Sequence, residues 1–398
     1  MYIYIYVCTH ELTHHRKEVI TMKFICSRAR LMDVVNTVQR AISAKSVMPI
    51  LECIKIESLD SSHIIMAGTN VDINIEYNLE CNVIEGGSVA LASKIFGEII
   101  RKMPDGNVTI DVNETNNITK ISCGSSEFNI QGQDVTGFPQ TPELDEKFSF
   151  TLEEQALKRL IRKSLPFIAV SEGKRPVLTG ALFDIKNNCL NVVTTDSHRI
   201  AAIKEELKGD VEDAKIVVPG QTLRELLKIL RDDEHQIKLI AGDRKLLFDF
   251  GSFKFFTRLL DGEFLRYEAI IAAVNPITMK INKRIFMDSL ERAILLINDD
   301  MSSSTDNKVP VRLSMGYDKL ELSCITGKGQ VRDSLKAEIE GGELEIGFNC
   351  RFLLDAMSVC DEELIHMEFS VPTSGCFIKS SLGDDSYVYM VLPVRLYN

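Results

Sequence analysis

An internal threefold repeat constrains the fold of this 398-residue chain more than any other feature. Each third begins with a strand-like segment and an amphipathic helix, continues through alternating strands to a second helix, and ends in further strands. Ser93, Gln221 and Cys350, at the starts of the three second helices, stand 128 and 129 residues apart. Solenoid repeats span only about 20–50 residues. Each unit is therefore expected to be a domain.

Strands dominate each third, and two helices accompany them. This pattern predicts an α+β fold of antiparallel sheets with helices on one face. Proline and polar residues interrupt the strands at 141–147 and 272–277, where linkers are expected. The predicted organisation is three structurally similar domains at residues 22–145, 146–274 and 275–398, because the regular pattern begins only at Met22. Residues 1–21 are expected to be a disordered extension or to precede the true start of translation.

The helices are charged differently from the rest of the chain. The formal net charge is −11, which alone argues against a protein that surrounds a polyanion. Yet the net charge is +3 for residues 28–45, +2 for each of 93–103, 153–163 and 222–231, +1 for 282–292 and zero for 350–360. If the helices share one face, that face suits sequence-independent contact with DNA phosphates. Lys and Arg that merely solvate helix surfaces are the alternative explanation.

Several classes of protein are excluded or disfavoured. No segment approaches the roughly 18 apolar residues that cross a membrane. The ten cysteines include no Cys-x-x-Cys pair and no zinc-ligand spacing, so reduced thiols in a soluble cytoplasmic protein, with no metal and no cofactor, are expected. The chain has no tryptophan and no sequence-reading nucleic-acid motif.

An enzymatic interpretation would use Asp196, Ser197, His198 and Arg199 as acid, nucleophile and base. Catalytic triads are assembled from distant segments, and neighbours on a strand point to opposite faces. The triplet at 327–329 (Gly-Lys-Gly) lacks the spacing of a phosphate-binding loop. We therefore predict no catalytic residues.

Six segments resemble one known family. They are 22–24 (Met-Lys-Phe), 48–51 (Met-Pro-Ile-Leu), 158–161 (Lys-Arg-Leu-Ile), 195–199 (Thr-Asp-Ser-His-Arg), 260–264 (Leu-Asp-Gly-Glu-Phe) and 392–396 (Leu-Pro-Val-Arg-Leu). In this order they resemble the β subunit of bacterial DNA polymerase III, the DNA sliding clamp. The combination of the five-residue motif Thr-Asp-x-His-Arg with a C-terminal Pro-x-Arg-Leu is specific to that family.

The resemblance implies a non-enzymatic processivity factor. Two protomers of three clamp domains would join head to tail in a ring around double-stranded DNA, with helices lining the hole. The ring would tether the DNA polymerase III catalytic subunit, other polymerases and repair proteins after loading by a clamp loader complex. From the helix charges and the resemblance together, the expected DNA-facing residues are Arg40, Lys45, Lys94, Arg101, Arg162, Lys174, Arg175, Arg224, Lys228, Lys283 and Arg284.

The resemblance also implies two protein contacts. The subunit contact would join Ile95, Ile99, Met103 and an edge strand near 122–130 of the first domain to Leu295 and Leu296 of the third. A hydrophobic pocket between the second and third domains would bind a short partner peptide. Its expected residues are Leu178, Thr195, His198, Arg199, Ile200, Leu265, Ile270, Cys376, Met390, Val391, Leu392, Pro393, Val394, Arg395 and Leu396.

The C-terminal tail supports the pocket physically, because its apolar residues are too many to leave in water without a purpose. A last core strand would explain Met390 but not Pro393 to Leu396. Two departures from the family are Ser197, where glycine is usual, and the overhang of Tyr397 and Asn398; both are expected to alter the edge of the pocket. A repeat scaffold that binds only proteins is the competing interpretation, and it would show no retention on DNA.

Overall fold

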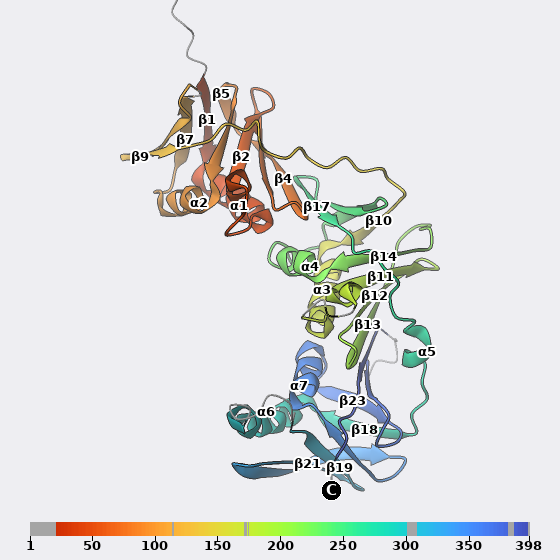
Figure 1. Ribbon diagram of the computed structural model, residues 1–398. Helices are drawn as coiled ribbons and strands as arrows, with labels where there is room; N and C mark the ends of the chain where they lie inside the picture. Colours follow the sequence, from red (N-terminus) through yellow and green to blue (C-terminus); the bar gives the residue numbers. More distant parts are fainter. Residues whose placement is uncertain are drawn as a thin grey trace, which may run out of the picture. The chain divides into compact units, whose positions relative to one another are not determined.

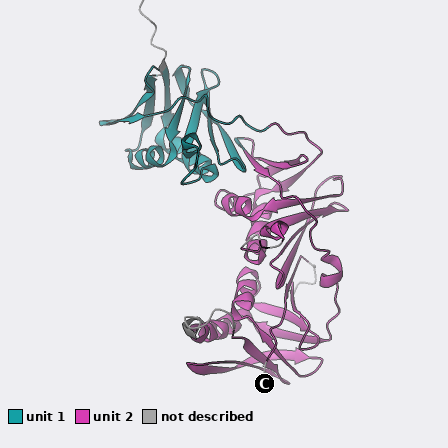
Figure 2. Cartoon of the chain, viewed as in Figure 1, with its two compact units in different colours: residues 1–142, 252–254 teal, residues 143–251, 255–398 magenta. Residues whose placement is uncertain are grey.

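The computed structural model describes residues 21–113, 115–170, 173, 175–300, 309–380 and 386–396. The chain divides into two compact units, one of residues 1–142 with 252–254 and one of residues 143–251 with 255–398 (Figure 2). The first unit contains the first predicted repeat, and the second contains most of the second repeat and all of the third. The N-terminal extension up to residue 20 lies outside the described residues. The predicted domain boundaries stay predictions.

The first repeat builds two sheets and two helices (Figure 1). Its elements are β1 (Thr21–Ser27), α1 (Arg28–Val38), β2 (Cys53–Ser58), β3 (His63–Thr69), β4 (Ile73–Glu80), β5 (Asn82–Glu85), β6 (Ser88–Ala92), α2 (Ser93–Lys102), β7 (Asn107–Asn113), β8 (Ile118–Cys123) and β9 (Ser126–Gln131). One sheet has the order β5-β1-β7-β8-β9. In the other, β2 lies between β6 and β3, and β4 follows β3.

The second repeat has the same order of elements, except that its described residues contain no counterpart of β5. They are β10 (Phe148–Glu153), α3 (Glu154–Ser164), β11 (Gly180–Lys186), β12 (Cys189–Thr195), β13 (Arg199–Glu206), β14 (Ala214–Pro219), α4 (Gly220–Leu227), β15 (Gln236–Ala241), β16 (Lys245–Asp249) and β17 (Phe253–Arg258). The short helix α5 (Glu268–Ile271), which the sequence pattern did not predict, lies in the connection to the third repeat.

The third repeat again follows this order. Its elements are β18 (Ile277–Asn282), α6 (Lys283–Asp300), β19 (Val311–Met315), β20 (Lys319–Thr326), β21 (Gly329–Glu340), β22 (Leu344–Phe348), α7 (Cys350–Val359), β23 (Leu364–Phe369), β24 (Cys376–Lys379) and β25 (Tyr387–Val391). The six predicted helices are therefore present, and the predicted α+β fold of three similar, antiparallel domains is confirmed.

Helical periodicity predicted these helices because each buries one apolar stripe. In α3, for example, Leu157, Leu160 and Ile161 are fully buried, while Arg159 and Arg162 on the other side are exposed. Within the second unit, α3, α4, α6 and α7 lie on one side of the strands (Figure 1).

One long sheet connects the second and third repeats. Its order is β14-β11-β12-β13-β25-β24-β23-β18-β21-β20-β19-β22. The connection is made by β25, the last strand of the third repeat, which pairs antiparallel with β13 over Arg199–Ile203 and Tyr387–Val391. Residues from both repeats therefore meet on one continuous sheet.

No helix of the described residues is long and apolar enough to cross a membrane. The nine cysteines in the described part of the chain carry free thiols. No group of three or more metal-ligating side chains occurs among the described residues.

Candidate functional site

The site is built on the face of the long sheet that points away from α3, α4, α6 and α7. Strand register places Leu182 opposite both Val217 and Val193, and it places Ile200 opposite Met390. Side chains directly opposite one another point to the same face. The resulting apolar face, buried from water, consists of Val177, Leu178, Leu182, Val193, Ile200, Ala202, Val217, Tyr267, Phe377 and Met390.

The connection between the two repeats covers this apolar face. Leu260, Phe264, Leu265, Ile270 and Ile271 pack against it and remain partly exposed. The phenol of Tyr267 donates to Oδ2 of the buried Asp184 over 2.8 Å, which fixes the connection to β11. Burial and this hydrogen bond raise the pKa of Tyr267, so the phenol stays protonated. The polar anchor was not predicted, although the aromatic residues Phe264 and Tyr267, shortly before the expected linker, were a usable signal.

The structure brings together five of the predicted pocket residues. Leu178, Ile200, Leu265, Ile270 and Met390 all belong to the apolar face or its cover. Thr195 pairs with Ile200 in the ladder and shares that face. The sequence reasoning missed Phe377, Tyr267 and Phe264, which contribute the aromatic rings.

Beside the apolar face lies a cleft of about 320 Å³. Leu182, Val217, Phe264 and Leu265 give it an apolar lining, and Lys215, Glu263, Arg266 and Glu268 surround it with charge. An apolar depression with a charged rim suits a short apolar peptide better than a polar metabolite.

Three other predicted pocket residues point to the opposite face of the sheet. Arg199 and Cys376 are both register partners of Val391. Because side chains alternate along a strand, this row lies on the side of the helices, away from Ile200 and Met390. Cys376 and Val391 are fully buried there. We therefore correct their expected role, since these side chains support the pocket from behind.

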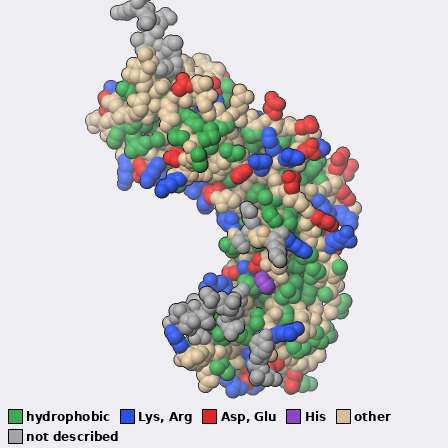
Figure 3. All heavy atoms as spheres, in the orientation of Figure 1, with side chains coloured by type: hydrophobic (Ala, Val, Ile, Leu, Met, Phe, Trp, Pro, Cys, Tyr) green, Lys and Arg blue, Asp and Glu red, His purple; other side chains and the backbone are tan. Residues whose placement is uncertain are grey.

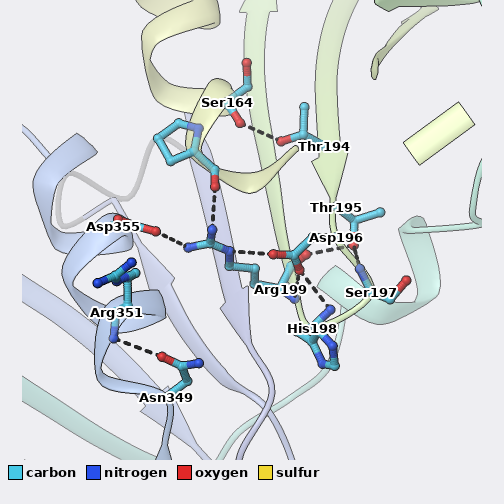
Figure 4. A network of polar contacts seen from close by, with 11 residues as sticks. Ser164, Thr194, Thr195, Asp196, Ser197, His198, Arg199, Asn349, Arg351 and Asp355 are labelled. Atoms are coloured by element: carbon cyan, nitrogen blue, oxygen red, sulfur yellow. Dashed lines mark hydrogen bonds and ion pairs between the residues drawn. The ribbon is translucent and has the colours of Figure 1, made fainter. Parts of the chain in front are cut away.

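Arg199 joins the two repeats. Its guanidinium donates to Asp196 Oδ2 over 2.9 Å, to Asp355 Oδ2 over 2.7 Å and to the carbonyl oxygen of Pro166 over 2.6 Å (Figure 4). It also lies between two rings, 5.2 Å from the centroid of Phe167 and 4.3 Å from that of Phe352. The side chain is only 8% exposed. Three of the five N–H donors of this buried side chain are thus used within the chain, which leaves Arg199 little capacity to bind a partner.

The turn between β12 and β13 presents His198 at the surface. Asp196 Oδ1 accepts the backbone N–H groups of His198 and Arg199 over 2.9 and 3.1 Å, and the Thr195 hydroxyl donates to the Arg199 carbonyl over 2.7 Å (Figure 4). Ser197 has φ of 75°. The exposed His198 ring stacks on Phe352 of α7 at 6.0 Å. This side chain thus stands where the two repeats meet.

The C-terminal tail is held against the third repeat. The N–H of Leu392 donates to the carbonyl of His198, and that of Val394 donates to the carbonyl of Gly347, each over 2.8 Å. A Cβ on Gly347 would lie 2.6 Å from Cδ2 of Leu396, so the tail needs glycine there. Leu392 is 39% exposed, Arg395 is exposed, and Pro393, Val394 and Leu396 are half-buried. The tail therefore offers apolar surface from a fixed position; Tyr397 and Asn398 lie outside the described residues.

Most predicted DNA-facing side chains are at the surface. In the first unit, Lys and Arg gather along the edge that carries α1 and α2 (Figure 3). Lys174 lies outside the described residues, and Lys283 is half-buried with its ammonium donating to the carbonyl of Cys360. The other nine are exposed: Arg40, Lys45, Lys94, Arg101, Arg162, Arg175, Arg224, Lys228 and Arg284.

Ion pairs divide these nine. Arg101 pairs with Glu98, Lys228 with Glu225 over 2.8 Å, and Arg162 with Asp361 over 2.8 Å. Burial would raise the pKa of Asp361, but the hydrogen bonds from Arg162 and Lys163 outweigh it and keep the pKa below its ordinary value. Within the described residues, no ion pair neutralises the other six. Those six are better suited to bind phosphate than the paired cations.

The predicted subunit contact needs one correction. Ile95 is 49% exposed and Leu295 is 69% exposed, while Leu296 is half-buried. Ile99 and Met103 are each only 4% exposed, because they lie on the buried stripe of α2 and beyond its end. Their side chains belong to the core of the first repeat and are not available to another subunit.

Comparison with known proteins covers nearly the whole chain. Models of the N-terminal, central and C-terminal domains of the DNA polymerase III beta subunit match residues 22–142, 151–265 and 270–395. The beta sliding clamp of Halalkalibacterium halodurans is 33% identical over 391 residues, with 94% of this chain and all of that protein covered. That of Staphylococcus aureus is 33% identical over 386 residues, with the same coverage.

Solved structures of the same family also match the chain. The DNA polymerase sliding clamp of Bacillus subtilis is 30% identical with a TM-score of 0.87, and 94% of this chain and all of that chain are covered. A DNA polymerase III beta subunit from Eubacterium rectale is 32% identical with a TM-score of 0.86, covering 94% and 99% of the two chains. The order of three clamp domains, the joined sheet and these similarities lead to one conclusion: the chain belongs to the family of bacterial DNA polymerase III β subunits, the β sliding clamps.

Proposed function

We propose that this protein is a DNA polymerase processivity factor that closes around duplex DNA and tethers the polymerase through the cleft and the tail beside the apolar face, where the second and third repeats meet. Sliding clamps are non-catalytic accessory subunits, so no residue is assigned a chemical step. The observation that carries the proposal is the match of three clamp domains, in order, over residues 22–395.

The ring would close head to tail through strand pairing. Within the chain, the last strand of the third repeat, β25, pairs with β13 of the second. The counterpart of β25 in the first repeat is β9, and the counterpart of β13 in the third is β21. In the described residues, β9 pairs only with β8, and Gly329–Lys336 of β21 pair only with β20. Pairing of β9 with the β21 of a second copy would repeat the internal junction and leave no open edge.

Exposed apolar side chains flank both free edges. Ile95 and Phe128 of the first repeat are 49% and 41% exposed, and Leu295 and Ile325 of the third are 69% and 71% exposed. Burial of such side chains is worth roughly 1.5–3 kcal/mol each. A homodimer would therefore gain apolar burial in addition to strand pairing.

The unpaired basic side chains would line the path of the DNA. Arg40, Lys45, Lys94, Arg175, Arg224 and Arg284 offer charge without reading bases, which suits a ring that slides. The net charge of −11 would disfavour contact of the other surfaces with DNA.

The cleft, the partly exposed side chains that cover the apolar face, and the tail would bind a short apolar peptide of the partner. The expected partners are the DNA polymerase III catalytic subunit, the clamp loader complex, and other polymerases and repair proteins that compete for one pocket. All of them act on DNA in the cytoplasm, where free thiols like those of this chain persist.

A retention experiment tests the function. The protein is loaded by the clamp loader of the same genome onto nicked circular duplex DNA, and the bound fraction is isolated by gel filtration. We expect the protein to stay on the circle and to leave after a restriction enzyme linearises it, because topology and not affinity holds a closed ring.

Equal loss from circular and linear DNA would overturn the proposal. That result, together with retained binding of the polymerase subunit, would instead identify a scaffold that binds only proteins. Turnover of a phosphoester or peptide substrate that disappears in His198→Ala would contradict the non-catalytic assignment.

A further inference from the structure

A continuous stack of side chains crosses the junction between the second and third repeats. It starts at α3, passes through β25 and ends at the exposed ring beside the tail. We call it the junction stack, and its members in order are Lys163, Tyr387, Tyr389, Phe167, Arg199, Phe352 and His198.

Each neighbour in the junction stack is in contact with the next. The ammonium of Lys163 lies 4.6 Å from the centroid of the Tyr387 ring, and the rings of Tyr387 and Tyr389 stack at 4.8 Å. Tyr389 and Phe167 stack at 5.0 Å with only 12° between their planes. Arg199 then bridges Phe167 to Phe352, and Phe352 carries His198 at 6.0 Å. These spacings are those of favourable ring pairs and cation–π contacts.

The repeats alternate along the stack. Lys163, Phe167, Arg199 and His198 belong to the second repeat, and the three others belong to the third. Phe167 and Tyr389 are fully buried, and Tyr387 is 2% exposed. No partner can touch these rings, yet they determine where Arg199 and Phe352 lie, and Phe352 supports His198 at the pocket.

We propose that Tyr389 and Phe167 are positioning residues for partner binding, which act at a distance by fixing His198 and Phe352 through the junction stack. This inference rests on the proposed function, because it concerns the affinity of the partner pocket. Cores are close-packed, so the removal of one ring leaves a gap that its neighbours partly fill by moving. Since the ring contacts run in series, a gap at Tyr389 or Phe167 shifts Arg199 and then the two rings beyond it.

The ring of Tyr389 matters in this proposal, and its hydroxyl does not. The hydroxyl oxygen is buried and has no hydrogen-bond partner among the described residues. Tyr389→Phe keeps the ring and removes only this unsatisfied group. Tyr389→Leu removes the ring, and Phe167→Leu removes its neighbour in a segment outside the sheet.

The test measures binding of the purified DNA polymerase III catalytic subunit to immobilised dimer, together with the melting temperature of each variant. We expect Tyr389→Leu and Phe167→Leu each to weaken binding about tenfold or more. Tyr389→Phe, which keeps the ring, should bind as tightly as the unaltered protein. In a His198→Ala background, Tyr389→Leu should cost much less additional affinity, because the positioned ring is gone.

Phe248→Leu is the matched control for loss of stability. Phe248 is also fully buried and stacked edge-on with Phe255 at 6.0 Å, but it lies in β16, outside the apolar face. If Phe248→Leu lowers the melting temperature as much as Tyr389→Leu and weakens binding equally, the stack has no special role and the inference fails. Additive losses in the His198→Ala background would also overturn it. Absence of binding by the unaltered protein would overturn the pocket itself, and the inference with it.

Discussion

Single residues set the turns that end the third strand of the first two repeats. In both, a threonine hydroxyl donates back across the turn, from Thr69 to the Ile73 carbonyl and from Thr195 to the Arg199 carbonyl. The third residue of each turn adopts the left-handed region, with φ of 81° for Val71 and 75° for Ser197. Residues with a Cβ are strained there, and β-branched residues most of all. Ser197, where the family resemblance leads us to expect glycine, thus adopts a backbone conformation that favours glycine.

Replacement of these residues by glycine should stabilise the protein. Relief of left-handed strain, about 1–2 kcal/mol, exceeds the extra entropy that glycine gives the unfolded chain, about 0.5–1 kcal/mol. We expect Ser197→Gly to raise the free energy of unfolding by about 0.5 kcal/mol and Val71→Gly by more, measured in urea. Ser149→Gly, inside β10, is the control and should lower it. Destabilisation by both turn variants would contradict the strain.

Two neighbouring carboxylates at the start of α3 should depend on pH in opposite ways. Burial raises the pKa of Glu154 above 4.5, so its stabilising contribution is complete below pH 4.5 and is lost as pH rises through the folded-state pKa. Hydrogen bonds, first from Lys208, lower the pKa of Glu153, whose contribution is present above 4.5 and is lost as pH falls.

Urea unfolding between about pH 4 and pH 8 checks this pair. Relative to the unaltered protein, Glu154→Gln should gain stability as pH rises, because the amide keeps an acceptor for the Arg231 N–H without a buried charge. Glu153→Gln should lose stability over the same range. If the stability of both variants relative to the unaltered protein changes in the same direction as pH rises, burial of Glu154 does not control its titration.

At the scale of elements, the outer sheet faces of the three repeats explain why the candidate pocket lies at the second repeat. Across the second repeat, one row of register partners is Val217, Leu182, Val193 and Ala202. The corresponding row in the first is Ala90, Lys55, Ala67 and Glu76. In the third repeat, a row on the same face consists of Gly347, Arg312, Ser323 and Arg332. Among these three rows, only that of the second repeat is apolar throughout.

Sequence patterns predicted the elements well and their contacts less well. Helices and their order followed from local periodicity, which needs no tertiary information. The role of Arg199 could not be predicted, because its acceptors at Pro166 and Asp355 are 33 and 156 residues away. The apolar face was also hidden, since the central strands β11 and β12 are buried on both sides and lose their alternation.

The position of the tail depends on one glycine of β22. A Cβ at Gly347 would approach both Leu396 and the carbonyl oxygen of Val394, at 2.6 and 2.8 Å. Gly347→Ala should therefore displace the tail, speed cleavage by trypsin after Arg395 because the backbone there is no longer held, and weaken binding of the polymerase subunit as far as deletion of residues 393–398 does. Gly316→Ala, where a Cβ would meet nothing closer than 3.9 Å, is the control. Unchanged proteolysis would mean that the tail tolerates the methyl group.

At the scale of the whole molecule, charge is divided between helices and the remaining surface, and ion pairs decide which cations are available. On α4, the exposed Arg224 has no ion pair in the described part of the chain, while Lys228, just after the helix, is held by Glu225. Arg224→Ala should reduce the slope of log K against log salt by about 0.9 for duplex DNA, and Lys228→Ala by less. Binding of a labelled duplex at several salt concentrations measures both slopes. If the two variants reduce the slope equally, either both side chains contact the DNA or neither does, and the ion pair of Lys228 does not distinguish them.

Closure of the ring should depend on the exposed apolar side chains of α6. Leu295→Ala combined with Leu296→Ala removes apolar burial worth roughly 1.5–3 kcal/mol per side chain from each of two identical contacts. We expect light scattering to report a monomer that still folds, because Leu295 is 69% exposed in the chain itself. Leu364→Ala with Val371→Ala removes side chains of similar exposure elsewhere in the third repeat, 47% and 49%, and should leave the dimer intact. If both double variants remain dimers, α6 does not contribute to the subunit contact. The proposed pairing of β9 with β21 would then not be stabilised by burial of Leu295 and Leu296.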